Sequence, residues 1–190
     1  MRSSFSATGP QSRIRLPTKN VLSRIYSAAV LGVDAYEVEI EVNAAGGNPK
    51  IVIVGLPDTA VKESQDRVTT AISNSGYYWP RGRTTINLAP ADVKKEGPSF
   101  DLPIALGMIA AAQEIGEDLF ADFCFVGELA LNGAVRAVRG VLPVALEARR
   151  RGKRAVVGPG RSASEATIGA WVWVVAVAML GRAFEWCWWV

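Results

Sequence analysis

The sequence contains no histidine and only two cysteines, Cys124 and Cys187, among its 190 residues. Without histidine, Ser-His-Asp and Cys-His catalysis are excluded, and the commonest transition-metal ligand is missing. Two cysteines so far apart in the sequence make neither a zinc site nor a disulfide framework, so a reducing cytoplasm is the expected compartment. We therefore expect no metal site and no catalytic triad in this chain.

A phosphate-binding loop and a membrane span are also missing. No G-x-x-x-x-G-K-[ST] motif occurs, and the Gly-rich stretch AAGGNPK lies between two predicted strands, where it cannot present helix amides to a phosphate. The longest apolar run, 168–181, has about fourteen residues, whereas a membrane-spanning helix needs about 20. We predict no nucleotide-binding residues and no membrane partner.

The composition that remains is that of one folded domain. Hydrophobic residues make up 49% and charged residues 21%, with a formal net charge of +3. Residues 1–20 are rich in Ser and Arg, lack acidic residues, and contain Gly9, Pro10 and Pro17, which break any helix. This pattern predicts a disordered basic extension over residues 1–20 and one domain over residues 21–190.

Hydrophobic periodicity predicts an α+β fold, in which a mixed sheet is covered by helices. Predicted strands are 26–32, 35–42, 50–56, 83–91 and 154–159, and predicted helices are 57–75, which stops at Gly76, 102–113, and a shorter one from Pro143 to the RRRG stretch. A hairpin is predicted over residues 122–138, with Asn132-Gly133 in a type I′ turn. A helical turn is predicted at 162–166. The Trp-rich tail is predicted to be a strand and a short helix with apolar surface for a neighbour.

The stretch KKEGPSFDLP, residues 94–103, places Ser99 after a Gly-Pro turn and before the apolar helix. A serine in such a turn can be a nucleophile if a base lies within hydrogen-bonding reach, and without histidine that base must be a lysine or a carboxylate. Lys94 and Lys95 are near in sequence. Alternatively, Ser99 or Asp101 caps the helix, with Pro103 in its first turn. The residues themselves favour the cap.

Two charged clusters have both a functional and a structural interpretation. The first is a basic cluster at the end of a predicted helix, and its positions make it a candidate for nucleic-acid binding. Its members are Arg149, Arg150, Arg151, Lys153 and Arg154. The same cations complement a helix C-terminus that ends at Gly152, and this structural interpretation is favoured. The second is the alternating row of Glu37, Glu39 and Glu41, which predicts the solvated face of a strand.

Three long stretches together resemble one family: VGLPDTAVKESQDRV (54–68), INLAPADVKKEGPSFDLPIALG (86–107) and FVGELALNGAVRAVRGVLPVALEA (125–148). They are similar to the N-terminal domain of the YifB/ComM proteins, magnesium-chelatase-like AAA+ ATPases, over residues 21–185. The resemblance implies a ribosomal protein S5 domain 2-like fold, shared with the Lon protease domain. It also implies an AAA+ module that uses ATP and Mg²⁺, hexameric assembly, and DNA branch migration in natural transformation. No Walker motif occurs in these 190 residues, so that module is expected to be absent here.

The resemblance to Lon also bears on Ser99. EGPSFD is similar to the DGPSAG turn that carries the Lon nucleophile, but RGVLPV places Leu142 where the Lon lysine base is expected. Leucine cannot accept a proton, so Ser99 is expected to be vestigial and the chain to be a non-catalytic accessory domain. Its expected partners are an AAA+ module or further copies of itself, and DNA. Two alternatives stay open: a degenerate Ser hydrolase that uses Lys94, Lys95 or Lys153, and a stand-alone nucleic-acid-binding module.

Overall fold

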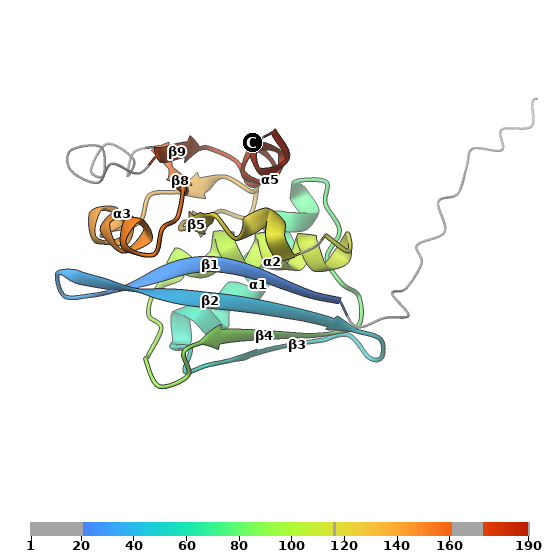
Figure 1. The fold of residues 1–190 in the computed structure, drawn as a ribbon. Coiled ribbons are helices and arrows are strands. Elements are labelled where there is room, and N and C mark those ends of the chain that lie inside the picture. The colour runs from blue at the N-terminus through green and yellow to red at the C-terminus, as the bar shows by residue number, and fades with distance from the viewer. Residues whose placement is uncertain (1–20, 116, 161–172, 190) are drawn as a thin grey trace, which may run out of the picture.

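The computed structural model describes residues 21–115, 117–160 and 173–189. The extension predicted for residues 1–20 and the helical turn predicted at 162–166 lie outside this part of the chain. The elements form a mixed α+β structure of two main sheets with helices between and around them (Figure 1). This agrees with the predicted fold class.

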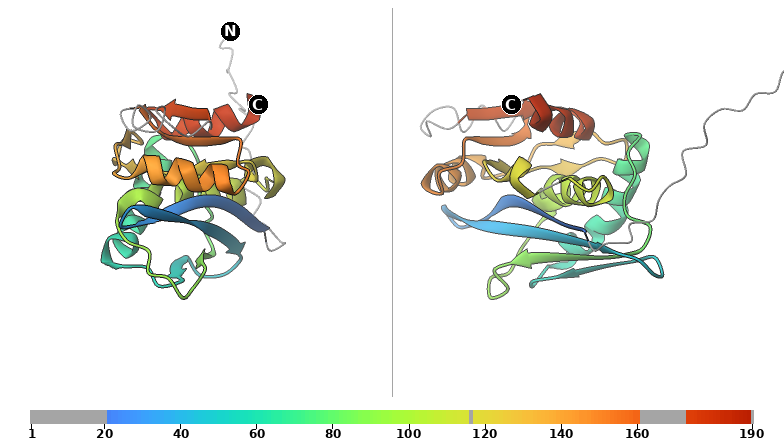
Figure 2. Two further views of the ribbon diagram at one scale, coloured as in Figure 1. Left: turned by 60° about the vertical axis from the view of Figure 1, so that its left-hand side comes forward. Right: turned by 45° about the vertical axis from the view of Figure 1, so that its right-hand side comes forward.

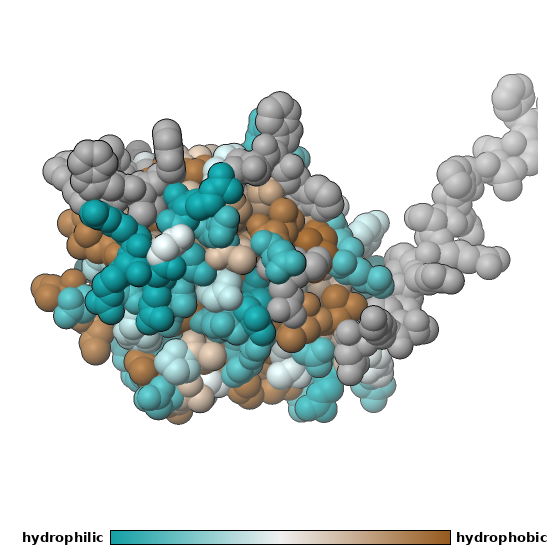
Figure 3. Space-filling model, viewed as in Figure 1, coloured by the Kyte–Doolittle hydropathy of each residue, from teal (hydrophilic) through white to brown (hydrophobic). Residues whose placement is uncertain are grey.

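The larger sheet has the order β1-β2-β4-β3. Strands β1 (Val21–Leu31) and β2 (Asp34–Ala45) form a long antiparallel hairpin, β4 (Arg83–Ala89) pairs antiparallel with β2, and β3 (Lys50–Val54) pairs parallel with β4. Both hairpin strands extend beyond the predicted ranges. Leu31 and Val33 at the hairpin tip are 70% and 89% exposed, and Figure 3 shows hydrophobic surface at this left-hand end.

The predicted alternation in β2 is confirmed on its inner face. Val38, Ile40 and Val42 are fully buried, because residues two apart on a strand share a face. The outer row is less solvated than predicted, since Glu39 and Glu41 are only partly exposed and lie 2.7 and 3.6 Å from the Arg24 side chain on β1. Cross-strand ion pairs therefore organise this face.

Helices α1 (Thr59–Asn74) and α2 (Asp101–Ala112) pack against the inner face of the larger sheet (Figure 1). Helix α2 is buried over almost its whole length, as its apolar composition predicts. Gly107 allows this close approach, because a Cβ at this position would come within 2.7 Å of the Val42 side chain. The Ser23 hydroxyl donates to the Gly107 carbonyl at 2.8 Å and joins β1 to the helix.

The smaller sheet is parallel, with the order β5-β8-β9. Its strands are β5 (Phe123–Phe125), β8 (Ala155–Pro159) and β9 (Trp173–Val177), and α3 (Val141–Arg150) connects β5 to β8. Helix α5 (Leu180–Trp189) follows β9. The views in Figure 2 place β8, β9 and α5 in a layer on the opposite side of α2 from the larger sheet. Two short 3₁₀ turns, Pro98–Phe100 and Glu117–Phe120, flank α2.

The predicted hairpin over 122–138 is partly wrong. Phe123–Phe125 pairs parallel with β8, and only β6 (Glu128–Leu129) and β7 (Val135–Arg136) form a hairpin. Its turn is not type I′, because that turn needs positive φ at both central residues and only Gly133 has it (+82°). The Gly133 N–H donates to the Ala130 carbonyl and the Ala130 N–H to the Ala134 carbonyl, as in a three-residue loop with a glycine bulge.

The C-terminal part contributes to the core more than predicted. Leu180, Ala183 and Phe184 on α5 are buried in the same cluster as Ile25 of β1. The predicted order of a strand and then a short helix is confirmed, but this face of the helix is covered by the domain itself. No helix in the described ranges is long and apolar enough to cross a membrane.

Candidate functional site

The turn before α2, with Ser99 at its centre, is held from both sides. Gly97 has φ +82° and its N–H donates to the Asp58 carboxylate at 3.1 Å, while the other Asp58 oxygen caps α1 through the Val61 N–H at 2.8 Å. On the opposite side, the Gly127 N–H donates to the Ser99 carbonyl at 2.9 Å. Ser99 therefore lies on a rigid, half-buried turn.

The predicted helix cap is wrong. The N-cap residue of α2 is Phe100, which makes no side-chain capping bond, and the 3₁₀ turn leads directly into the helix. Asp101 is instead wholly buried and accepts bonds from the Arg67 Nε at 2.9 Å, the Arg67 Nη2 at 3.2 Å and the Leu129 N–H at 3.2 Å. Burial raises the pKa of the Asp101 carboxyl, and the bonds from Arg67 and Leu129 oppose that rise. Asp101 thus joins α1, α2 and β6.

The lysines proposed as bases for Ser99 have other partners. Lys94 pairs with Glu96 at 2.7 Å on the surface. Lys95 is fully buried, its Nζ donates to the Pro90 carbonyl, and burial lowers its pKa. Lys153 donates to the Ala121 carbonyl at 2.8 Å.

No hydrogen bond joins Ser99 Oγ to a lysine within the described ranges. Leu142, predicted to stand in place of the Lon base, lies in the first turn of α3 and is 38% exposed. A general base must lie within about 3 Å of the proton that it takes, directly or through one water. Ser99, the predicted equivalent of the Lon nucleophile, therefore has no lysine amine hydrogen-bonded to its hydroxyl in the described part of the chain.

The basic cluster at the end of α3 is largely paired within the domain. Glu147, almost fully buried, lies 3.3 Å from Arg150 Nε and 2.9 Å from Arg151 Nε. Lys153 lies 3.6 Å from Glu37 and over the Tyr26 ring at 3.2 Å from its centroid.

Arg154 is 3.7 Å from Asp122, and Arg149 is the member of the cluster without an ion pair in the described structure. Gly152 has φ +73° and its N–H donates to the Arg149 carbonyl, which confirms the predicted helix end. Three carboxylates thus offset much of the cluster's charge.

Both cysteines are free and buried. Burial raises the pKa of each thiol to about 12, so neither is a thiolate at neutral pH. In the described part of the chain, no group of three or more Cys, Asp or Glu side chains could hold a metal ion.

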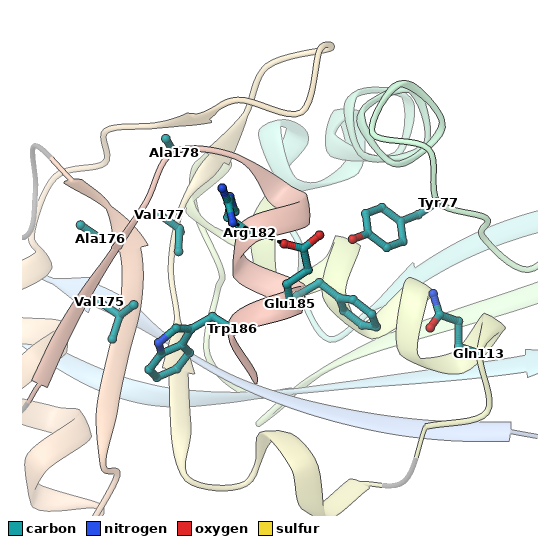
Figure 4. A pocket seen from close by; sticks show the side chains of 10 residues that line it. Tyr77, Gln113, Val175, Ala176, Val177, Ala178, Arg182, Glu185 and Trp186 are labelled. Carbon is teal, nitrogen blue, oxygen red and sulfur yellow. Dashed lines mark ion pairs between the residues drawn. The ribbon is translucent and has the colours of Figure 1, made fainter. Parts of the chain in front are cut away.

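Two hollows among the described residues lie outside the predicted site. One, of about 920 Å³, lies between β9, α5 and Tyr77 (Figure 4) and is lined mainly by apolar side chains, with Arg182 and Glu185 paired at 3.8 Å. The other, of about 520 Å³, lies at the C-terminal end of α1 and is lined by Tyr77, Tyr78, Trp79 and Arg81 with small residues. The run YYWPRGR in the sequence was the available signal for the second hollow.

Comparison with known proteins agrees with the resemblance. Residues 40–162 match the family described as subunit ChlI of Mg-chelatase. The chain is 46% identical to YifB of Escherichia coli over 136 residues and 46% identical to competence protein ComM of Haemophilus influenzae over 147 residues, which are 72% and 77% of this chain. It is 27% identical to Lon protease 2 of Thermus thermophilus over 157 residues, 79% of this chain and 19% of that protein. The chain spans 27% of the length of YifB and 29% of the length of ComM.

Proposed function

We propose, from the premise that this chain belongs to the ChlI family of Mg-chelatase-related proteins and to its YifB/ComM branch, that it is a non-catalytic accessory domain. Its role would be to position a substrate or an AAA+ module, without breaking a covalent bond itself. The observation that carries this proposal is the isolation of Ser99. Each lysine considered as its base is bonded to another group.

The buried lysine makes the strongest case. A Ser-Lys mechanism needs a neutral amine whose lone pair faces the serine hydroxyl. Lys95 has the lowered pKa that such a mechanism would use, but its Nζ is directed to the Pro90 carbonyl. Moving it to Ser99 would first break that bond, which the amine makes in its buried position. The alternative of a degenerate Ser hydrolase therefore has little support in the geometry.

The relation to Lon supports a finer statement of the fold. We infer that the domain has the ribosomal protein S5 domain 2-like fold, because a Lon protease aligns with 79% of the chain and the Ser99 turn is held rigidly by backbone hydrogen bonds. Its Ser99 turn would then be a retained structural element. The Gly97 and Asp58 contacts that hold it have a structural use of their own, since they begin α1.

The proposed partners follow from the length of the relatives. Because the chain covers less than a third of YifB or ComM, we assign ATP and Mg²⁺ binding to an AAA+ module in the part of those proteins that this chain does not match. The domain would act in the cytoplasm beside that module, as part of a hexamer or by self-association, in competence-related DNA processing. The name of ComM, a competence protein, supports the last point.

The second alternative, a nucleic-acid-binding module that uses the basic cluster of α3, has weaker support. Most of that cluster is paired with Glu147, Glu37 and Asp122. A cation already paired with a carboxylate releases fewer counterions on binding a phosphate, so its contribution to affinity is smaller.

The test uses the purified 190-residue chain and its Ser99→Ala variant. Both are expected to lack ATPase activity and to leave an unfolded protein substrate uncleaved, with no difference between them. The part of YifB that this chain does not match should bind the chain and hydrolyse ATP. ATP hydrolysis by the chain alone, or cleavage abolished by Ser99→Ala, would refute the proposal.

A further inference from the structure

The 520 Å³ hollow at the end of α1 presents aromatic rings on a fixed frame. Helix α1 ends at Asn74, and Gly76, φ +81°, turns the chain so that the Tyr77 N–H donates to the Ile72 carbonyl at 3.1 Å. The Tyr77 ring then packs edge-on against Phe184 at 5.4 Å, and Trp79 packs against the main core. Tyr78 between them is 68% exposed. Two anchored rings thus hold a third one out toward solvent.

Three cations lie in or next to the segments that line this hollow. Arg81 lines the hollow, Arg83 begins β4, and Lys50 begins β3 directly opposite Arg83 in the strand register. In Figure 1 the segment that follows α1 runs down the right-hand side to the start of β4, beside the loop that joins β2 to β3. Pro49 of that loop also lines the hollow, and the Lys50 N–H donates to the Gly82 carbonyl at 3.4 Å. All three side chains are exposed.

Carboxylates are scarce around these cations. The segments that build this side, 42–57 and 67–91, contain no Asp or Glu. Within the described ranges, none of the three cations makes an ion pair. Burial and the charge of Glu185 raise the pKa of Tyr77. Glu185 lines the other hollow, however, and is paired there with Arg182 at 3.8 Å. The charge here is therefore uncompensated, unlike that at the end of α3.

We propose that this hollow binds single-stranded nucleic acid, with an unpaired base stacked on Tyr78 and the flanking phosphates held by Arg81, Arg83 and Lys50. Exposed aromatic rings beside a cationic groove are how proteins bind single strands without reading sequence. A duplex hides the faces of its bases, so it gains only the phosphate contacts. A proline-rich peptide would use the rings but has no need of three unpaired cations. The site goes beyond the accessory role proposed above and does not rest on it.

The test is fluorescence anisotropy with the full chain and a labelled oligothymidylate of about 20 nucleotides, between about 50 and 200 mM salt. Tyr78→Ala is expected to weaken binding about five-fold or more, because base stacking on an aromatic ring contributes about 1–3 kcal/mol. Tyr78→Phe keeps the ring and should bind like wild type. Arg81→Glu should weaken binding and lower the slope of log affinity against log salt by about 0.7 for each phosphate that is no longer neutralised.

Arg149→Glu is the matched control, since it makes the same charge change on an exposed arginine of α3. It should leave the affinity almost unchanged. The proposal is overturned if the chain does not bind the oligonucleotide, if Arg149→Glu weakens binding as much as Arg81→Glu, or if Tyr78→Ala has no effect. It is also overturned if duplex DNA, thymidine monophosphate or a proline-rich peptide binds as tightly as the single strand. Circular dichroism of each variant confirms that it is folded.

Discussion

The Arg67–Asp101 pair gives the sharpest prediction for stability. Arg67→Met keeps most of the side-chain stem on α1 but removes the two N–H groups that bond to Asp101. The carboxylate is then left fully buried with the Leu129 N–H as its remaining donor. Removing one partner of a buried pair strands the charge of the other, and this costs more than the pair itself contributes.

The expected loss is about 3 kcal/mol, the lower end of the range of about 3–5 kcal/mol for broken buried pairs. The lower end applies because the Arg67 side chain is 26% exposed, so water can reach part of the vacated space. For a domain of this size, such a loss lowers the melting temperature by about 6–12 °C. Adding Asp101→Asn to the variant removes the stranded charge and should recover part of the loss.

The measurement is urea unfolding of wild type and variants, with Lys62→Met as the control on the exposed face of α1. That control should change stability by less than about 0.5 kcal/mol. Without Arg67, the pKa of Asp101 rises further above its unfolded value of about 3.9, so the folded state binds more protons between those two values. The free energy of unfolding of Arg67→Met therefore falls as pH rises, and its loss relative to wild type should be smaller near about pH 5 than near about pH 8.

A loss below about 1 kcal/mol for Arg67→Met would refute this reasoning, because a stranded buried carboxylate cannot cost so little. A deficit that does not change with pH would refute it as well. So would a double variant that is less stable than the single one, since it would mean that the charge at Asp101 is not the source of the cost.

Three further outcomes are expected. Lys95→Met should be neutral or stabilising in urea unfolding, because burial lowers the pKa of the Lys95 amine and the unfolded state therefore binds more protons. For the same reason the free energy of unfolding of the wild type should rise with pH above the folded-state pKa of Lys95, and the variant should not show this rise. Gly107→Ala should destabilise the fold by about 1–3 kcal/mol, because its methyl group would overpack the contact with Val42. The loss should be smaller when Val42→Ala is added. Full stability of the single variant would contradict the close packing of α2 on the sheet. Cys124 and Cys187 should react with a thiol reagent only at the rate of unfolding, and fast labelling of the native chain would show that they are accessible.

Local patterns in the sequence predicted those elements whose determinants are themselves local. Helix α2 follows from a continuous apolar run, and the ends of α1 and α3 follow from Gly76 and Gly152, whose positive φ values confirm their role. The alternation in β2 predicted its buried face for the same reason.

Features that depend on distant partners were not predicted. In the sequence Asp101 resembles a helix cap, because its actual partner Arg67 lies 34 residues earlier. Phe123–Phe125 resembles one arm of a hairpin because its parallel partner β8 follows α3 in the sequence. Lys95 is charged, and a pattern that assigns charged residues to the surface cannot anticipate a fully buried one.

The placement of α5 in the core has a consequence for synthesis on the ribosome. Leu180 and Phe184, near the end of the described chain, share a buried cluster with Ile25 near its beginning, and the Leu180 N–H bonds to the Gly133 carbonyl. Translation is vectorial, so the side of α2 that faces away from the larger sheet cannot be covered by α5 until α5 has left the exit tunnel. Helices α1 and α2 can pack on the larger sheet early, whereas the apolar residues of α2 that contact α5 stay exposed until the end of synthesis and form a surface that a chaperone can bind.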